Sequence, residues 1–431
     1  MKRTASIATL GCKTNQHESV VMEEKLRLAG YELVDFSEGA DLVVVNTCTV
    51  TAATDSQSRN LIRRARRMNI DCRVIVTGCY AQIDPETLRT IPGVAVVLGN
   101  EEKQDLLRYL DDEQQAQIVD VSDIRSSGDS VPLTLSAFTE RSRAFVQIQN
   151  GCDAFCSYCI IPYARGTSRS MPPEQVIQQV LSLQQQGYPE VVFTGIHIGG
   201  YGKDLDPPSS LVELLRRVED QTEVPRLRLG SVEPTEIPAE LLELMAESSR
   251  ICPHLHIPLQ SGDNQVLKRM NRHYTTQFFH ELVRTAHNKM PEAAIGLDVI
   301  AGYPGESEDE FDHTCRLLEN LPISHLHVFP YSRRPGTPAA EVADQLPGEL
   351  IKSRAAMIRA IGERKNRQFC ERFIGRVLEV VVEGGEMDGY SRGLSRNYLS
   401  IMFKSNPKLQ GKRAWVKILG WKPDGLHGEL I

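Results

Sequence analysis

The segment Gly151-Cys-Asp-Ala-Phe-Cys-Ser-Tyr-Cys159 holds three of the ten cysteines of this 431-residue chain within eight residues. It directly follows an apolar run at 144–149 that predicts a β-strand. Structural zinc sites usually combine paired cysteines with a fourth Cys or His, and no such partner follows Cys159. The C-x3-C-x2-C spacing instead offers three thiolates to an iron–sulfur cube and leaves one iron without a protein ligand. The segment therefore predicts a cluster with an open binding position, and zinc remains the alternative.

An alternating pattern of strands and helices surrounds this segment and extends from 141 to 369. Its predicted strands lie at 144–149, 191–194, 227–229, 255–259, 295–300 and 324–329. Helical patterns separate them, and a long charged helix at 348–369 closes the series. Six such units predict a partial (β/α)6 barrel, whose active-site face is the face at the carboxyl ends of the strands.

Two further domains flank the predicted barrel. Residues 1–120 alternate β-branched runs with helical patterns, which predicts a three-layer α/β domain with a parallel sheet. Its strands are expected at 6–10, 42–45, 74–77 and 94–98, and its helices at 18–29, 58–68 and 85–90. Residues 121–140 are polar and rich in turn-forming residues, so they predict a linker. Residues 370–431, with β-rich runs at 376–382, 398–403 and 413–418, predict a small β-barrel.

Three more cysteines follow strands of the first predicted domain. Cys12, Cys48 and Cys79 each come within three residues of the end of a predicted strand. Because the carboxyl ends of parallel strands lie at one edge of the sheet, we expect these three residues to meet there. Cys72 precedes its strand and is expected at the opposite edge, in a structural role.

Composition excludes several classes of protein. The net charge is −7, so the chain is not a generic nucleic-acid binder, and any RNA contact has to come from local patches. No apolar run approaches the roughly 20 residues that a membrane-spanning helix needs. The first residues do not fit a signal peptide, so we expect a cytoplasmic protein without membrane contact.

The C-x3-C-x2-C segment resembles the signature of the radical S-adenosylmethionine (SAM) enzymes. The stretches at 9–16, 46–50 and 77–82, which contain the other three cysteines, resemble the motifs of the methylthiotransferase family. Members of that family combine an amino-terminal domain, a radical SAM core and a carboxyl-terminal TRAM domain, an OB-like RNA-binding barrel. The resemblance covers essentially the whole chain and implies two 4Fe–4S clusters.

The resemblance also assigns these clusters and their chemistry. Cys152, Cys156 and Cys159 would hold the cluster whose open iron binds SAM and whose electron generates a 5′-deoxyadenosyl radical. Cys12, Cys48 and Cys79 would hold an auxiliary cluster whose open iron carries the sulfur to be transferred. One SAM-dependent step would methylate the sulfur and another would activate the substrate. The residues expected to contact SAM or substrate are Tyr158, Thr194, Gly195, Gln260, Ser261 and Arg272.

Two pairs of histidines also lie in the predicted barrel. His254 and His256 share one face of a strand, and His325 and His327 share one face of another. We interpret them as satisfied histidines of the barrel interior rather than as metal ligands.

RNA contacts are expected in two places. Six arginines lie between Arg59 and Arg73 against one aspartate, and Arg63, Arg64, Arg66 and Arg67 spread over more than one helix face. They predict a phosphate-binding patch, with an ordinary charged surface helix as the alternative. In the TRAM-like segment, loops containing Arg396 and Lys412 are expected to meet RNA.

The family has branches that differ in substrate. The motifs at 11–16, 78–82 and 327–337 look most like the branch that acts on N6-threonylcarbamoyladenosine in tRNA, although Thr14 stands where an apolar residue is usual. The implied reaction converts this nucleoside at position 37, in the tRNA anticodon loop, to its 2-methylthio form by inserting sulfur at adenine C2. Arg333 and Arg334 are candidates for binding the threonyl carboxylate.

The implied partners are the tRNA, an external electron donor such as flavodoxin or ferredoxin, and a sulfur donor. Two other functions stay open at this point. One is the same chemistry on N6-isopentenyladenosine tRNA, and the other is a non-catalytic iron–sulfur RNA-binding protein.

Overall fold

The structure is a computed structural model that describes residues 3–110, 116–125 and 142–431. Most of the predicted linker at 121–140 lies outside the described residues. The described chain forms two compact units. The first contains the described residues before 126 together with Gln147–Met171 and Ser332–Ala340. The second contains the remaining described residues, including most of the barrel and the carboxyl-terminal segment.

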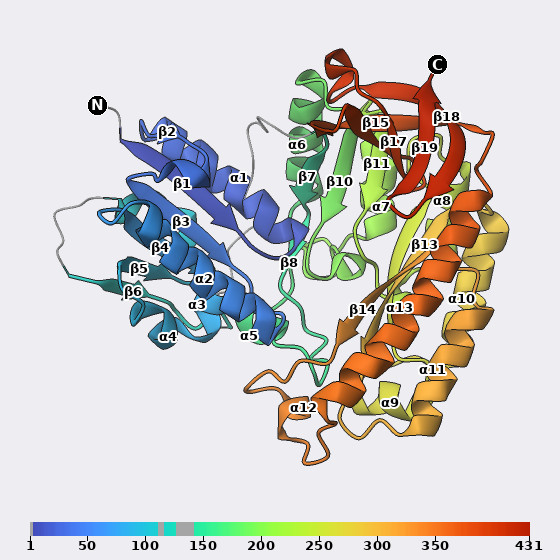
Figure 1. Cartoon of the computed structure of the whole chain (residues 1–431), viewed down its shortest axis with the longest axis horizontal. Coiled ribbons are helices and arrows are strands. Elements are labelled where there is room, and N and C mark those ends of the chain that lie inside the picture. Colours follow the sequence, from blue (N-terminus) through green and yellow to red (C-terminus); the bar gives the residue numbers. More distant parts are fainter. Residues whose placement is uncertain (1–2, 111–115, 126–141) are drawn as a thin grey trace. The chain divides into compact units, whose positions relative to one another are not determined.

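A six-stranded sheet in the order β2-β1-β3-β4-β5-β6 forms the centre of the first unit (Figure 1). All its neighbouring strands pair in parallel. The strands are β1 (Thr4–Thr9), β2 (Glu32–Leu33), β3 (Leu42–Thr47), β4 (Arg73–Gly78), β5 (Val94–Leu98) and β6 (Ile118–Asp120). Every residue of β3 is buried, as expected for an apolar strand covered on both faces.

Helices cover both faces of this sheet. Val43 and Val45 of β3 pack in a core that includes Ile62 of a helix, whereas Val44 packs in a second core that includes Met22. The helical segments are α1 (Lys13–Leu28), α2 (Ala52–Met68), α3 (Cys79–Ile83), α4 (Pro85–Arg89) and η2 (Glu102–Tyr109). The alternation of side chains between two cores confirms the predicted three-layer α/β arrangement.

Two of these helices begin earlier than predicted. Helix α1 starts at Lys13 rather than at residue 18, and Cys12 is its N-cap residue without a side-chain capping hydrogen bond. Helix α2 starts at Ala52 rather than at residue 58, because Thr51 and Thr54 form a capping box. Both helices therefore start close to a cysteine, which the apolar periodicity used for the prediction did not reveal.

The second unit contains a partial barrel of six strands, as predicted. They form two three-stranded sheets, β11-β10-β7 and β12-β13-β14, joined by the isolated parallel bridges Leu227↔Ile251 and Ser231↔His256. The strands are β7 (Ala144–Gln147), β10 (Glu190–Thr194), β11 (Arg226–Leu229), β12 (His254–Gln260), β13 (Ala294–Ala301) and β14 (His325–Pro330). The surrounding helices are α6 (Pro173–Gln185), α7 (Leu211–Gln221), α8 (Ala239–Glu247), α9 (Asn264–Arg269), α10 (Thr276–Lys289), α11 (Glu308–Asn320) and α13 (Gly348–Glu371).

The predicted strand at 144–149 is broken in the structure. Strand β7 ends at Gln147, and the short β8 (Gln149–Asn150) pairs instead with β9 (Arg169–Ser170) in antiparallel orientation. Chain segment Gln147–Met171, which contains the C-x3-C-x2-C motif, belongs to the first compact unit.

The carboxyl-terminal segment forms the predicted small barrel, closed in the order β15-β16-β17-β19-β18. Its strands are β15 (Val377–Met387), β16 (Tyr390–Ser395), β17 (Ser400–Lys404), β18 (Arg413–Lys422) and β19 (Gly425–Leu430). Strands β16 and β19 were not expected from the sequence. Arg228 attaches this barrel to the rest of the second unit. It forms a buried ion pair with Glu190, and it also donates to the carbonyls of Ser395 and Arg396 of the barrel.

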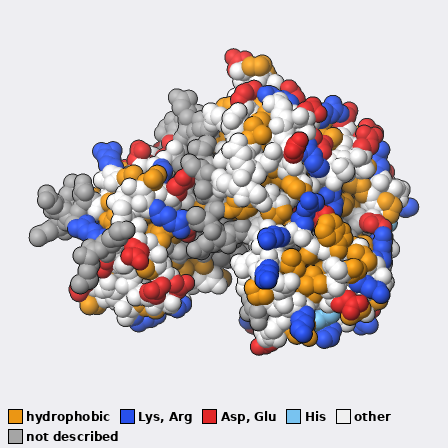
Figure 2. Space-filling view, turned by 90° about the horizontal axis from the view of Figure 1, so that it is seen from above, with side chains coloured by type: hydrophobic (Ala, Val, Ile, Leu, Met, Phe, Trp, Pro, Cys, Tyr) orange, Lys and Arg blue, Asp and Glu red, His pale blue; other side chains and the backbone are white. Residues whose placement is uncertain are grey.

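Charged side chains of both signs lie at the surface. Basic and acidic side chains are interspersed over the face that Figure 2 shows. In the part of the chain that the structure describes, none of the helices is both long and apolar enough to span a lipid bilayer.

Candidate iron–sulfur and SAM site

Cys12, Cys48 and Cys79 follow three neighbouring strands at the same edge of the sheet. Thr9 of β1 is in register with Asn46 of β3, and Asn46 is in register with Thr77 of β4. Cys12 is the N-cap of α1, Cys48 directly follows β3, and Cys79 is the first residue of α3. The structure thus brings these cysteines to one edge, as expected, and Cys72 precedes β4 at the other edge.

Two glycines allow the loops that carry these cysteines to approach one another. Gly11 has φ +101°, and a Cβ atom there would lie 2.9 Å from Cys48 Sγ. Gly78 has φ +96°, and its Cβ atom would lie 2.4 Å from the carbonyl oxygen of Thr47. Both positions need glycine because of the backbone conformation and because of the short distances.

Burial disfavours the thiolate form of Cys48. Burial, with the neighbouring thiols of Cys79 and Cys12, raises the pKa of Cys48 to about 12. Metal ligation requires thiolates, so this edge needs positive charge, part of which the N-terminus of α1 supplies at Cys12. Among the described residues the cysteines do not form a group with the close spacing of a single-ion site. Ligands to separate irons of a cube do not need that close spacing.

Arg165 lies beside Cys79. Its Nε donates to Cys79 Sγ at 3.1 Å, and its Nη groups donate to Asn15 and to the carboxylate of Glu18. Lys103 forms a second ion pair with Glu18 at 2.6 Å. Although burial alone would raise the pKa of Glu18, Arg165 and Lys103 lower it to about 2. Glu18 is therefore an anion at neutral pH.

The second cysteine trio lies in the loop between β8 and α5 (Ile161–Arg165). Cys156 is buried, and Cys152 and Cys159 are half-buried. The loop is held by backbone hydrogen bonds from Cys159 to Cys156 at 2.9 Å and from Cys152 to Gly166 at 3.0 Å. All six predicted cluster ligands therefore belong to the first compact unit.

The two candidate substrate arginines have different environments. Arg334 is buried, and its Nη2 lies 2.7 Å from Asp55 Oδ2 and 2.6 Å from Thr49 Oγ1. Arg333 is exposed. The guanidinium of Arg334 is thus already paired with the carboxylate of Asp55. Arg333 therefore remains the candidate for binding the substrate carboxylate.

The candidate SAM contacts lie on two different parts of the chain. Tyr158 is half-buried in the cysteine loop of the first unit. In the second unit, Thr194 and Gly195 lie at the end of β10, and Gln260 and Ser261 at the end of β12. Buried Arg272 forms an ion pair with Glu233, a partner that the sequence pattern did not reveal.

The barrel histidines are not all satisfied interior residues, so that prediction is partly wrong: His327 is exposed, and Nε2 of His325 is buried without a hydrogen-bond partner in the described part of the chain. His256 and His327 contact the carboxylate of Asp298. His256 Nε2 lies 2.7 Å and His327 Nδ1 lies 3.5 Å from Asp298 Oδ1, and these histidines hold the pKa of Asp298 below its usual range although burial opposes this. Burial, with the neighbouring His256 and His327, lowers the pKa of His325 to about 3. His256, Asp298 and His327 are the described residues whose ligand atoms have single-ion spacing, within 4.8 Å of one another. The contacts of His256 and His327 with Asp298 bring these three groups together.

The predicted RNA-binding residues are not equally accessible. Arg63, Arg64 and Arg67 of α2 are exposed, as is Lys412. Arg66 is half-buried and packs against Gly93. Arg396 is half-buried too, and it donates to the carbonyl of Ile251 at 3.1 Å.

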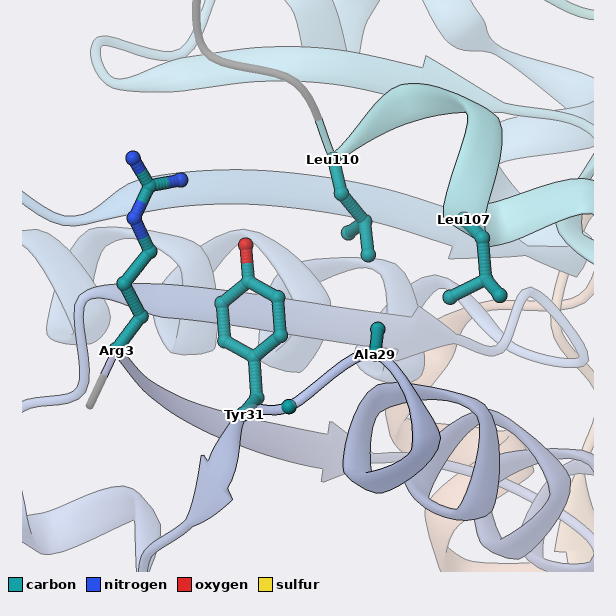
Figure 3. A pocket seen from close by; sticks show the side chains of 6 residues that line it. Arg3, Ala29, Tyr31, Leu107 and Leu110 are labelled. Atoms are coloured by element: carbon teal, nitrogen blue, oxygen red, sulfur yellow. The ribbon is translucent and has the colours of Figure 1, made fainter.

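A pocket of about 330 Å³ lies away from the cysteines. Arg3, Gly30 and Tyr31 line it together with Ala29, Leu107 and Leu110 (Figure 3). Arg3 directly precedes β1, so the pocket lies at the amino-terminal end of that strand, whereas Cys12 follows its carboxyl end. The pocket is therefore not part of the candidate cluster site.

Models of two protein families match parts of this chain. A model of the radical SAM superfamily matches residues 146–318, and one described as the uncharacterized protein family UPF0004 matches residues 4–99. A radical SAM methyltransferase structure, TsrM from Kitasatospora setae, has a similar fold, with a TM-score of 0.54 and 17% identity over 79% of this chain and 74% of that one. Fold and cysteine loop define a radical SAM enzyme, a class that uses SAM and a 4Fe–4S cluster.

Comparison with curated relatives identifies the family within the radical SAM enzymes to which this chain belongs. The threonylcarbamoyladenosine tRNA methylthiotransferase MtaB of Bacillus subtilis is 41% identical over 96% of this chain and 94% of its own length, and that of Aquifex aeolicus is 37% identical over 91% and 95%. The chain belongs to this family of tRNA methylthiotransferases. A tRNA-2-methylthio-N(6)-dimethylallyladenosine synthase of Acetivibrio thermocellus is 31% identical over 100% of this chain and 91% of its own length.

Proposed function

We propose that this enzyme converts N6-threonylcarbamoyladenosine at position 37 of tRNA to its 2-methylthio derivative. The observation that carries this proposal is the presence of two cysteine trios in one compact unit of a chain from this family. One trio alone would suffice for SAM cleavage, so the second trio at the sheet edge needs another purpose. Sulfur transfer provides that purpose.

The chain's own residues fit two iron–sulfur clusters. We assign Cys152, Cys156 and Cys159 to the cluster that binds SAM, and the sheet-edge trio Cys12, Cys48 and Cys79 to an auxiliary cluster. When bound, these clusters and SAM supply the radical, the sulfur and the methyl group. The protein contributes the thiolates, and it contributes buried positive charge beside Cys79 through Arg165.

Other residues would position SAM and substrate. Tyr158 is assigned to the adenine of SAM, and Thr194, Gly195, Gln260, Ser261 and Arg272 to the remaining SAM or substrate contacts. The exposed guanidinium of Arg333 would bind the threonyl carboxylate by charge-assisted hydrogen bonds.

The RNA would contact two basic surfaces. The exposed arginines of α2 and the loops of the carboxyl-terminal barrel, a TRAM-like domain, would bind the phosphates of the anticodon loop. The reaction also requires an external electron donor such as flavodoxin or ferredoxin and a source of sulfur. Because tRNA is the substrate, we place the enzyme in the cytoplasm.

Nucleoside mass spectrometry of tRNA from a deletion strain tests this proposal. We expect the 2-methylthio form of threonylcarbamoyladenosine to disappear and its unmodified precursor to accumulate. The 2-methylthio derivative of isopentenyladenosine, where the strain makes it, should be unchanged. Loss of the isopentenyladenosine derivative instead would show that isopentenyladenosine tRNA is the substrate. No change in either nucleoside would contradict the proposal altogether.

A further inference from the structure

Arg165 is a fully buried charged residue beside Cys79. Its side chain is 0% exposed, and it lies at the end of α5, six residues after Cys159. A guanidinium without solvent is costly unless charged or polar partners surround it. Its side-chain partners are Cys79, Glu18 and Asn15 from the beginning of the chain, and Asn150 at 3.5 Å.

The charges of this buried group do not balance without a thiolate. Arg165 and Lys103 are positive, and Glu18 is the negative partner of both. Asn15 is neutral, so one positive charge remains, and Arg165 directs Nε at the Sγ atom of Cys79. The group is therefore built to face an anion, and a cluster-bound thiolate at Cys79 supplies that negative charge.

We propose that Arg165 sets the reduction potential of the cluster held by Cys12, Cys48 and Cys79, and that it acts as a positioning residue for that cluster. This inference rests on the proposed function, since it assumes that these cysteines bind a cluster. Hydrogen bonds to ligand sulfurs and nearby charge are the protein's means of adjusting such potentials. A positive charge stabilises the reduced, more negative cluster, so Arg165 raises its potential.

The position of Arg165 also connects the two cysteine trios. The loop that carries Cys152, Cys156 and Cys159 leads directly into Arg165, whose guanidinium contacts a ligand of the other trio. Asn100 strengthens this connection, because its Nδ2 donates to the carbonyl of Ala164 at 2.6 Å. Displacement of the cysteine loop would therefore move the charge beside the auxiliary cluster.

The test uses the full-length chain with Cys152, Cys156 and Cys159 all changed to alanine, so that a single cluster remains. After anaerobic reconstitution, a redox titration followed by electron paramagnetic resonance gives the potential of that cluster. Arg165→Gln should shift the potential downward, and Arg165→Lys should shift it less, because the charge stays while the planar guanidinium is lost. Glu18→Gln should shift it upward, because a negative charge is removed.

Arg73→Gln is the matched control. Arg73 begins β4, and Cys79 follows the other end of that strand, so the potential should not change. Iron analysis of each variant separates a change of potential from a loss of the cluster. If Arg165→Gln does not retain iron, the opposite shifts expected for Arg165→Lys and Glu18→Gln decide the question.

The result that would contradict the proposed function differs from the result that would contradict the proposal for Arg165. If the starting variant binds no iron before any change at Arg165, the proposed function fails. If the cluster is present but its potential is the same in Arg165→Gln, or if the Arg165 and Glu18 variants shift in the same direction, the proposal for Arg165 is overturned.

Discussion

Arg333 and Arg334 show how adjacent residues with the same side chain can have different roles. Both residues follow the last predicted strand of the barrel, and the sequence alone did not distinguish their roles. The structure buries Arg334 against Asp55, with exposed side-chain fractions of 5% and 12%, and leaves Arg333 at the surface. A substrate anion can be reached by Arg333 without breaking an existing ion pair.

We therefore expect Arg334→Ala and Arg333→Ala to affect different properties. Arg334→Ala leaves the Asp55 carboxylate buried without its partner and should lower the free energy of unfolding by about 3–5 kcal/mol. Arg333→Ala should change it by less than about 0.5 kcal/mol but should raise the KM for tRNA. Urea denaturation and steady-state kinetics measure the two effects. Equal stability of both variants would contradict this assignment.

His325 should make stability depend on pH. Its folded-state pKa is lowered to about 3 by burial, from an ordinary value of 6.5. Between these values the unfolded chain binds a proton that the folded chain does not, so the stabilisation is present above pH 6.5 and is lost as the pH falls. His325→Gln should show a shallower acid-side loss of the free energy of unfolding.

His273→Gln provides the reference for this pH series, since His273 is an exposed histidine of the same unit. Its pH profile should match that of the wild-type protein. Identical profiles for His325→Gln and the wild-type protein would show that His325 does not carry the effect.

At the scale of elements, the turn between β4 and α3 depends on Gly78. Gly78→Ala would combine a left-handed backbone conformation with a Cβ atom 2.4 Å from the carbonyl oxygen of Thr47. Gly30 is a matched position, with φ +89° and no atom within 4 Å of an added Cβ. Gly30→Ala should cost about 1–2 kcal/mol, and Gly78→Ala should cost more and reduce iron binding. Similar unfolding midpoints for the two variants would exclude a special role for this turn.

Helix α2 tests the predicted RNA surface. The triple variant Arg63→Glu, Arg64→Glu and Arg67→Glu should weaken tRNA binding and flatten its dependence on salt, because fewer phosphates are neutralised. The control reverses three other exposed arginines of the same unit, Arg27, Arg89 and Arg108. Affinity measurements at several salt concentrations compare them, and an equal loss in both triple variants would indicate only a general charge effect.

The sequence predicted those strands and helices whose pattern lies within a few consecutive residues. Strands β1, β3, β4 and β5 are short runs rich in β-branched residues, and parallel pairing then placed three cysteines at one edge. The early start of α2 was missed because a capping box, not periodicity, marks it. The early start of α1 has no side-chain cap that could have indicated it. The contact of Arg165 with Glu18 was also missed, since 147 residues separate the partners and no local pattern connects them.

At the scale of the whole molecule, the two cysteine trios are far apart in sequence and yet belong to one compact unit. The predicted domain boundaries at 120 and 141 separate the trios, whereas the compact unit includes both. This grouping follows from the chain segment Gln147–Met171, which leaves the barrel after β7 and provides Arg165 to the strand-end site. Both trios are therefore expected to bind clusters.

Iron analysis of anaerobically purified protein tests this claim most directly. We predict about eight irons per chain in the wild-type protein, and about four after Cys12, Cys48 and Cys79 are all changed to alanine. An iron content that is unaffected by these three substitutions would contradict the account.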